Sequence, residues 1–420
     1  MERPASHDGA TPEALRVLLG GVPFGRDNIG DEAIVECVAE MVRDAAPNAH
    51  VAICCDNTAT AQRLGLATEP LLGFLEPWTG LKAIQQVLSD YDVWIWAGAT
   101  GLSDYPHVGI QLLEAAERQG LRRILFGVGM NSELNPALYR LGPGWKRSAL
   151  EKLASITGGA LRPVEWLDRR RDSAMRLRIS RALSAADLII VRDVESRDEL
   201  GRGSPGWDPS RIGIGADPAL RIRPMSPGEL PLTPGERRLL SRSARRIGIC
   251  ISAQRPVTHG GELAKMVGEW LDEPAAAVFG IPMNPETDAE WLRNLRAETP
   301  GAERFVVVEN CRTPAAVAGL AGQMDVVVSS RLHLLILAAI SRTPLAGIGR
   351  GSKVASFLKP FHLEPAGEAE NVDFTRLHGE VQRLLDRDQA EAFREKAAEA
   401  LRDFGERLRT MDTQLRHALA

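Results

Sequence analysis

The sequence predicts an α/β protein in which two doubly wound, Rossmann-like domains face one another across a cleft. The chain has 420 residues, 44% of them hydrophobic, which is too long for one ordinary core and ample for two. Short β-branched runs alternate with segments of helical periodicity in both halves, which is the pattern of parallel sheets covered by helices. Between the halves, residues 223–243 are rich in proline with scattered glycine and serine, as linkers are.

These observations predict four segments. Residues 14–222 form an N-terminal Rossmann-like domain, and residues 223–243 form the linker. Residues 244–385 form a second Rossmann-like domain. The charged segment 386–420 is expected to be a long amphipathic C-terminal helix that crosses back onto the first domain.

In the first half, each apolar run is expected to be a strand that feeds a helix. Residues 132–170 break this rhythm with glycine, proline and tryptophan, and so long an irregular stretch is usually functional or mobile. The expected strands are residues 15–22, 50–55, 92–97, 123–128, 188–191 and 212–214. The expected helices are residues 30–45, 59–64, 81–88, 107–119 and 175–185.

The second half repeats the alternation. Its expected strands are residues 246–252, 276–281, 305–308, 325–328 and 345–348. Its expected helices are residues 262–271, 288–297 and 314–322, with one more between the last two strands.

Composition excludes several classes of protein. A net charge of -4 and a pI near 6.1 give no field for nucleic acid. The five cysteines have no zinc spacing, so we expect no metal site and buried free thiols in a reducing cytoplasm. Neither a signal-peptide pattern nor an apolar run of membrane length is found, which predicts a cytoplasmic protein without an integral membrane segment and leaves peripheral membrane contact open. The P-loop, H-E-x-x-H, G-x-S-x-G and first-strand G-x-G-x-x-G motifs are also missing.

Residues 325–353 contain the strongest candidate for a site. A β-branched run ends at Ser329 and Ser330, one of which is the expected N-cap of a buried helix. Arg331 and His333 would then lie in the first turn, where free backbone N–H groups favour anions. Lys353 follows the next strand and should lie at the same edge of the sheet, where ligands bind.

Four motifs resemble those of the polysaccharide pyruvyl transferase family, in the family's order. They are S-S-R-L-H-x-x-I-x-A from Ser329, N-x-G-D-E-A-I from Asn28, A-D-x-x-x-x-R-D-x-x-S from Ala186, and Asp217-Pro218. The resemblance implies a GT-B-like arrangement of the two domains. It also implies transfer of pyruvate from phosphoenolpyruvate onto two hydroxyls of one sugar, giving a cyclic ketal, with a sugar or lipid-linked glycan as acceptor and no cofactor.

The resemblance also suggests roles for individual residues. His333 is the candidate acid that protonates the donor's methylene carbon, and Arg331 suits the donor's phosphate or carboxylate. Arg192 is the candidate second cation, from the other half. The remaining candidate substrate-binding residues are Ser329, Ser330, Lys353, Asn28, Gly30, Asp31 and Gly98.

Two loops carry the acceptor side of this prediction. Asp31 and Glu32 would repel a phosphate, so we expect the loop of Asn28, Gly30 and Asp31 to meet acceptor hydroxyls. Gly98 begins a loop in which the family usually has a run of glycines, whereas this chain has Ala99 and Thr100.

Simpler interpretations exist for most of these residues. His333 could be a hydrogen-bonded core histidine, with His107 the next candidate acid. Arg331 could pair with a neighbouring acid, and Arg192 with Asp187 or Asp193.

Two other functions also fit the sequence. A GT-B glycosyltransferase using a nucleotide sugar is one, although no acidic pair late in the second domain is placed to hold a ribose. A catalytically silent glycan-binding partner is the other: the altered loop after Gly98 favours it, and the intact Arg331 and His333 oppose it.

Overall fold

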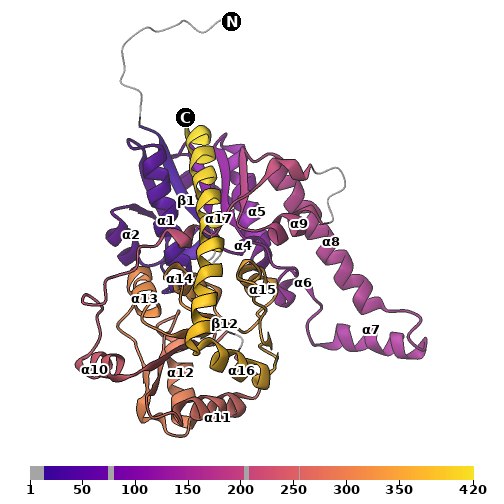
Figure 1. Ribbon diagram of the computed structural model, residues 1–420. Helices are drawn as coiled ribbons and strands as arrows, with labels where there is room; N and C mark the ends of the chain where they lie inside the picture. The colour runs from indigo at the N-terminus through magenta and orange to yellow at the C-terminus, as the bar shows by residue number, and fades with distance from the viewer. Residues whose placement is uncertain (1–13, 74–79, 203–207, 255) are drawn as a thin grey trace, which may run out of the picture.

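Two parallel β-sheets, one in each half of the chain, carry the architecture (Figure 1). The computed structural model describes residues 14–73, 80–202, 208–254 and 256–420. The first sheet has strand order β3-β2-β1-β4-β5-β6-β7 and the second β10-β9-β8-β11-β12. The order reverses between β1 and β4, and again between β8 and β11, as in doubly wound folds. The predicted fold class is confirmed.

Every strand of these two sheets pairs in parallel with its neighbours. The first sheet consists of β1 (Arg16–Phe24), β2 (His50–Cys55), β3 (Ala67–Glu69), β4 (Val93–Ala97), β5 (Arg122–Val128), β6 (Leu188–Val191) and β7 (Ile212–Ile214). The second consists of β8 (Arg245–Cys250), β9 (Ala276–Gly280), β10 (Phe305–Val307), β11 (Val326–Ser329) and β12 (Leu345–Gly347). A small antiparallel pair, β13 (Gly367–Glu368) and β14 (Asn371–Val372), follows.

The central strands are apolar on both faces because helices cover both faces of the sheet. All five residues of β4 are fully buried, and the rings of Trp94 and Trp96 meet edge to face with centroids 5.9 Å apart. The Trp96 ring fills the space beside Gly109, where an added Cβ would come within 1.8 Å of it. Glycine at this helix position therefore lets the indole fit under the helix.

The helices of the first half mostly follow the predicted rhythm. They are α1 (Ile29–Ala45), α2 (Thr58–Leu64), α3 (Leu81–Leu88), α4 (Gly101–Asp104), α5 (Pro106–Arg118), α6 (Pro136–Tyr139), α7 (Trp145–Ile156), α8 (Pro163–Ser184) and α9 (Val194–Gly201), with short 3-10 turns η1 (Pro209–Arg211) and η2 (Pro218–Arg221). The expectation of an irregular segment at 132–170 is wrong, because α6, α7 and the start of α8 occupy most of it. The glycines and prolines there separate helices. Strand β3 was also missed.

The helices of the second half agree with the predicted alternation. They are α10 (Pro234–Arg242), α11 (Gly260–Leu271), α12 (Thr287–Glu298), α13 (Pro314–Ala321), α14 (Leu332–Ile340), α15 (Ser352–Leu358), α16 (Phe374–Leu384) and α17 (Arg387–Leu419), with 3-10 turns η3 (Ala302–Arg304) and η4 (Lys359–Phe361). Helix α10 lies inside the proline-rich segment that we expected to be a linker. A capping box between Thr233 and Glu236 starts it.

Helix α17 runs along both halves of the molecule, as predicted (Figure 1). Near its start, the ring of Phe393 stacks on Phe361 of the second half at 6.0 Å. Towards its end, Met411 Sδ accepts a hydrogen bond from the backbone N–H of Ala216 in the first half. The helix therefore contacts both halves, near its start through stacked aromatic rings and near its end through Met411. Among the described residues, no helix is both long and apolar enough to cross a membrane.

Candidate active site

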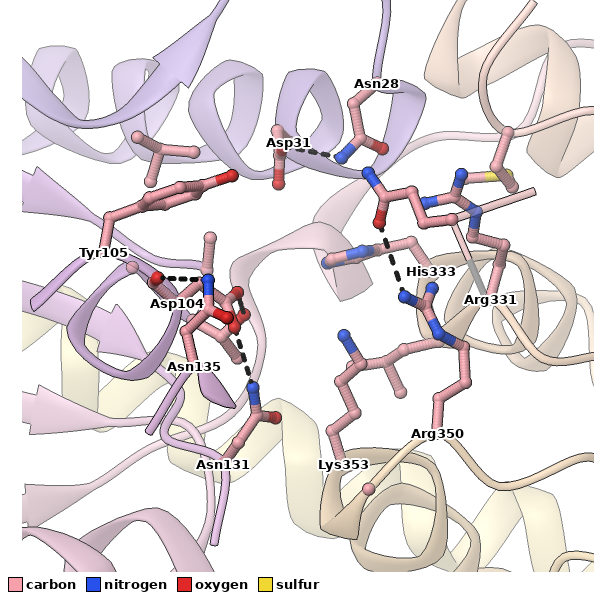
Figure 2. Close-up of a pocket in the computed structure, with 18 of the residues that line it drawn as sticks. Asn28, Asp31, Asp104, Tyr105, Asn131, Asn135, Arg331, His333, Arg350 and Lys353 are labelled. Atoms are coloured by element: carbon pink, nitrogen blue, oxygen red, sulfur yellow. Dashed lines mark hydrogen bonds between the residues drawn. The ribbon is translucent and has the colours of Figure 1, made fainter. Parts of the chain in front are cut away.

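A cavity of about 780 Å³ lies between the two sheets, at the carboxyl ends of their strands (Figure 2). One wall follows β1, β4, β5 and β6, and the other follows β8, β9, β11 and β12. Ligands of open α/β sheets bind at this edge. Six predicted site residues line the cavity: Asn28, Asp31, Arg192, Arg331, His333 and Lys353.

His333 projects into the cavity from the first turn of α14 (Figure 2). Its side chain is 15% exposed, and its ring packs closely on Gly30 of α1. A Cβ at position 30 would lie only 2.3 Å from His333 Nδ1. Gly30 itself does not line the cavity, so its part in the site is to leave room for this imidazole.

Asp217 lies behind the imidazole. His333 Nε2 is 3.6 Å from Asp217 Oδ2, and Arg192 Nη1 donates to the same oxygen at 3.4 Å. Burial raises the pKa of Asp217, but the favourable interactions with His333 and then Arg192 outweigh it, so this pKa lies below its ordinary value. Asp217 is therefore an anion at neutral pH that can hold the orientation of His333.

Arg192 is 6% exposed and reaches the cavity from the end of β6. Its Nε donates to Asp193 at 3.2 Å, and its guanidinium lies against Gly129, where a Cβ would come within 2.5 Å of Arg192 Cζ. Pairing with Asp193 was one of the simpler interpretations. In the structure, Arg192 both pairs with Asp193 and lines the cavity.

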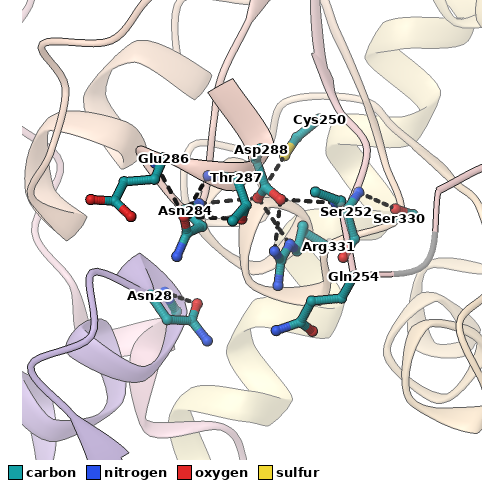
Figure 3. A network of polar contacts seen from close by, with 12 residues as sticks. Asn28, Cys250, Ser252, Gln254, Asn284, Glu286, Thr287, Asp288, Ser330 and Arg331 are labelled. Atoms are coloured by element: carbon teal, nitrogen blue, oxygen red, sulfur yellow. Dashed lines mark hydrogen bonds and ion pairs between the residues drawn. The ribbon is translucent and has the colours of Figure 1, made fainter. Parts of the chain in front are cut away.

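Arg331 forms a two-pronged ion pair with Asp288 (Figure 3). Its Nε and Nη2 donate to the two carboxylate oxygens at 3.0 and 2.7 Å, and Asp288 is fully buried. Asp288 also accepts from the backbone N–H groups of Ala253 and Asn284, both at 3.0 Å. The pairing interpretation thus holds for two of the guanidinium nitrogens. Nη1 makes no hydrogen bond with the part of the chain that the structure describes.

Lys353 and Arg350 follow β12 and extend the cationic wall. Arg350 Nη1 donates to Ser252 Oγ at 2.7 Å and Nη2 to Gln254 Oε1 at 3.4 Å, so this guanidinium is held in place. Burial, reinforced by neighbouring Arg350, lowers the pKa of Lys353 to about 8. No side chain among the described residues forms a salt bridge with this amine, which points into the cavity in Figure 2.

The opposite wall carries several carboxylates and amides together with Arg26 and Arg192, and some of these acids and amides are labelled in Figure 2. Asn131 Nδ2 donates to Asp104 Oδ1 at 3.1 Å, and Asn135 Nδ2 donates to the Asp104 carbonyl at 3.1 Å. Near them, Asn28 Nδ2 donates to Asp31 Oδ2 at 2.6 Å. Burial raises the pKa of Asp31 above its ordinary value, although His333 and Asn28 partly offset this.

Three other predicted residues lie beside the cavity rather than in its lining. Ser329 and Ser330 are fully buried and hold the turn before α14: Ser329 Oγ accepts from Arg331 N, and Ser330 Oγ accepts from Ser252 N. The expectation that one of these serines is the N-cap is wrong, because α14 starts at Leu332 with Arg331 as N-cap. Gly98 has a φ of +65° and lies against Ile34, so it shapes the loop whose Ala99 and Thr100 line the cavity.

Several residues of the site were missed or left unassigned. Asp217 belongs to a quoted motif, so a signal for it was present. Asp288, Asp104, Asn131 and Arg350 lie in no motif and could be found only by their proximity in space. Glu32, expected beside the acceptor, instead accepts hydrogen bonds from Gly25 N and Thr60 Oγ1 and is buried.

Two further features bear on the chemistry. Within the described ranges, no group of three or more His, Cys, Asp or Glu side chains is placed to hold a metal ion. His107, the reserve candidate for the acid, does not line the cavity, and burial lowers its pKa.

Solved structures share this fold at low sequence identity. A putative UDP-N-acetylglucosamine 2-epimerase from Listeria monocytogenes is 13% identical with a TM-score of 0.59, and the match covers 92% of this chain and 91% of that one. S. aureus MnaA, solved with UDP, is 12% identical with a TM-score of 0.61 over 92% and 91%. Anabaena HepE, solved with UDP-glucose, is 10% identical with a TM-score of 0.56 over 96% and 99%. These likenesses show that the fold is GT-B-like.

Sequence comparison identifies the family. No curated protein is similar enough to count as a match. The family model described as polysaccharide pyruvyl transferase, however, matches residues 28–352, which include the cavity residues described above except Arg26 and Lys353, which lie just outside the match. The chain therefore belongs to the polysaccharide pyruvyl transferase family.

Proposed function

We propose that this protein transfers pyruvate from phosphoenolpyruvate onto two hydroxyls of a sugar in a polysaccharide or its precursor, forming a cyclic ketal. One observation carries the proposal: a wall with Arg331, Arg350 and Lys353 faces, across a single cavity, a wall with several carboxylates and amides. The donor is a small anion with a phosphate and a carboxylate, whereas the acceptor offers hydroxyls. The two walls match the two substrates in chemistry.

The cationic wall suits the donor. Arg331 presents Nη1, while its salt bridge to Asp288 fixes the plane of the guanidinium. The Lys353 amine, with a pKa of about 8, is mostly charged at neutral pH; Asp104 attracts it, but no counter-ion in the described part of the chain lies within salt-bridge distance. A bound phosphate or carboxylate would supply that counter-ion, which favours binding of a compact dianion.

The opposite wall suits a sugar. Carboxylate groups accept hydrogen bonds from sugar hydroxyls, and amide groups both donate and accept them; the Asp104 carboxylate is already oriented by Asn131 and Thr100. Asp31 has a raised pKa because it is buried, so it is a stronger base than an exposed aspartate. We assign to Asp31 the proton of the attacking hydroxyl.

The proposed chemistry has an addition and then a substitution at one carbon. Protonated His333 gives a proton to the methylene carbon, which becomes a methyl group, and the first sugar oxygen bonds to the adjacent carbon as it loses its proton to Asp31. The second sugar oxygen then bonds to the same carbon and gives its proton to the now neutral His333, while the C–O bond to phosphate breaks and the phosphate takes the proton held by Asp31. The products are the ketal and inorganic phosphate. Asp217 is a positioning residue in this scheme, because it holds the imidazole and does not touch substrate.

The reducing cytoplasm is the proposed location of this reaction. All five cysteines are buried and free, which is typical of proteins kept in reducing surroundings.

A nucleotide-sugar transferase is the second candidate. It is favoured by one observation, namely that structures sharing the fold were solved with UDP and UDP-glucose. Five basic side chains of the cavity, Arg192, Arg331, His333, Arg350 and Lys353, favour the compact anionic donor.

The decisive experiment is incubation with phosphoenolpyruvate and candidate glycans in D₂O. We expect phosphate release that depends on the glycan, and a product whose new methyl group carries one deuteron from solvent. Release of UDP from a UDP-sugar, with no phosphate from phosphoenolpyruvate, would instead establish the second candidate. Thermal shift adds a binding readout, since a ligand of the folded state raises Tm: phosphoenolpyruvate should do so and UDP-sugars should not.

A further inference from the structure

Helices α7 and α8 form a hairpin that projects from the body of the molecule (Figure 1). No residue of α7 is buried, and the four buried residues of α8 all lie in its second half. A helix of a globular protein normally buries one apolar stripe against the core. The outer part of this hairpin has no such partner within the described chain.

Helix α7 nevertheless carries an apolar stripe, and the stripe faces solvent. Trp145, Ala149, Leu153 and Ile156 recur at intervals of four, four and three residues, which places them on one face of the helix. Trp145 is 77% exposed and Ile156 is 74% exposed. In α8, Trp166 is also exposed, at 61%. Exposed large apolar side chains that gather in this way mark an interaction surface.

The stripe is bordered by positive charge. Lys146 and Lys152 flank it on α7, and the Lys146 amine lies 5.7 Å from the Trp145 ring centroid. On α8, the Arg170 guanidinium lies 5.4 Å from the Trp166 ring, and Arg171 follows it. None of these four cations pairs with a carboxylate of the described residues.

The four acids of the outer hairpin all accept hydrogen bonds, Asp168 from the backbone N–H of Leu141 and Asp172 from Arg176. Glu151 accepts from Arg147, and Glu165 accepts from Arg162 and Arg169. The hairpin therefore presents exposed tryptophan and aliphatic side chains together with uncompensated positive charge.

We propose that the α7–α8 hairpin docks the protein on the anionic surface of a lipid bilayer. An apolar helix face with tryptophan at its edge and lysines beside it is the composition that binds the boundary between headgroups and acyl chains. A second copy of the chain is the less favourable occupant. It would bring the like charges of two hairpins together, and like charges facing one another across an interface are unfavourable.

The hairpin is continuous with the cavity wall. Asn135 lines the cavity, and α6 begins at the next residue and leads into α7. Docking through α7 would therefore keep the cavity close to the membrane surface, where a lipid-linked sugar would be held. The docking itself does not depend on the proposed reaction, because its test measures binding without turnover.

The test is co-sedimentation of the full chain with sucrose-loaded vesicles. Vesicles of phosphatidylcholine with phosphatidylglycerol should bind the protein, and vesicles of phosphatidylcholine alone should bind it at least about tenfold more weakly. The K146E/K152E variant should lose at least about tenfold in partitioning to anionic vesicles, because each basic residue near an anionic surface contributes on the order of fivefold. Lys265→Glu with Lys396→Glu is the matched control: both lysines are exposed on other helices, and this variant should bind like wild type.

The apolar part of the proposal needs a separate readout. Brominated lipids should quench tryptophan fluorescence of the wild type, and the quenching should fall sharply in W145F/W166F. Two results would overturn the proposal. The first is equal binding to anionic vesicles by K146E/K152E and by its control variant. The second is a wild-type protein that does not bind anionic vesicles but dimerises in light scattering, with the dimer lost in I156S.

Discussion

Gly30→Ala should disable the site through a single methyl group. An added Cβ would lie 2.3 Å from His333 Nδ1 and 2.6 Å from His333 Cγ, whereas ordinary contacts begin at 3.4 Å. The imidazole or the start of α1 must therefore move by about 1 Å. A misplacement of this size in a catalytic group can cost on the order of a hundredfold in rate.

The fold should tolerate this change, because alanine is favoured over glycine inside a helix by about 1 kcal/mol, which offsets part of an overpacking cost of about 1–3 kcal/mol. We therefore expect a roughly hundredfold lower kcat for glycan-dependent phosphate release, with a Tm that falls by only a few degrees. The matched control is Gly379→Ala in α16, where nothing lies within 4 Å of the new Cβ. A Gly30→Ala variant with near-normal kcat would refute the placement of His333 against α1 as the reacting group.

Three further predictions test other parts of the site. His333→Gln should keep most of the donor affinity measured by calorimetry and lower kcat by on the order of a hundredfold to ten-thousandfold, because glutamine can hydrogen-bond to the donor but cannot protonate its carbon. Near-normal turnover by a folded variant would exclude His333 as the acid. In the free enzyme Lys353 loses its charge as pH rises through its pKa of about 8, so the donor affinity of the wild type should fall above that pH. This decline should disappear in Lys353→Arg, because arginine stays charged. If the pH profile of donor affinity is the same in both proteins, the Lys353 amine lies outside the donor site. Asp288→Asn should lower the free energy of unfolding by about 3–5 kcal/mol in urea titrations, because it leaves the buried Arg331 without its counter-ion. A loss below about 1 kcal/mol would show that the ion pair is not needed for the fold.

Local pattern was enough to predict the elements of this fold. The apolar runs of β4 and β11 are buried on both faces, and such runs have no other stable place in a protein of this size. Because parallel strands end at a common edge, residues that follow different strands were expected to meet. His333 after β11 and Lys353 after the neighbouring strand β12 do line one cavity.

The same reasoning failed where apolar residues do not face a core. Residues 132–170 were expected to be irregular because Gly142, Pro143 and Gly144 interrupt the alternation. Helix α7 follows them, but its apolar stripe faces solvent, so it does not fit the pattern of a helix packed on a sheet. Similarly, the serines before α14 fitted the composition of an N-cap, yet they bond to Arg331 and Ser252 instead.

By itself, the sequence determined the family, the parallel strand and helix order, and the identity of the imidazole and cations at one sheet edge. Only the tertiary structure decided how those groups are held. Asp288 lies 43 positions from Arg331 in the chain, and Asp217 reaches His333 from the other half of the molecule. Which residues pair depends on their distance in space and on the free-energy cost of leaving a buried charge unpaired. The spacing of residues along the chain gives neither of these quantities.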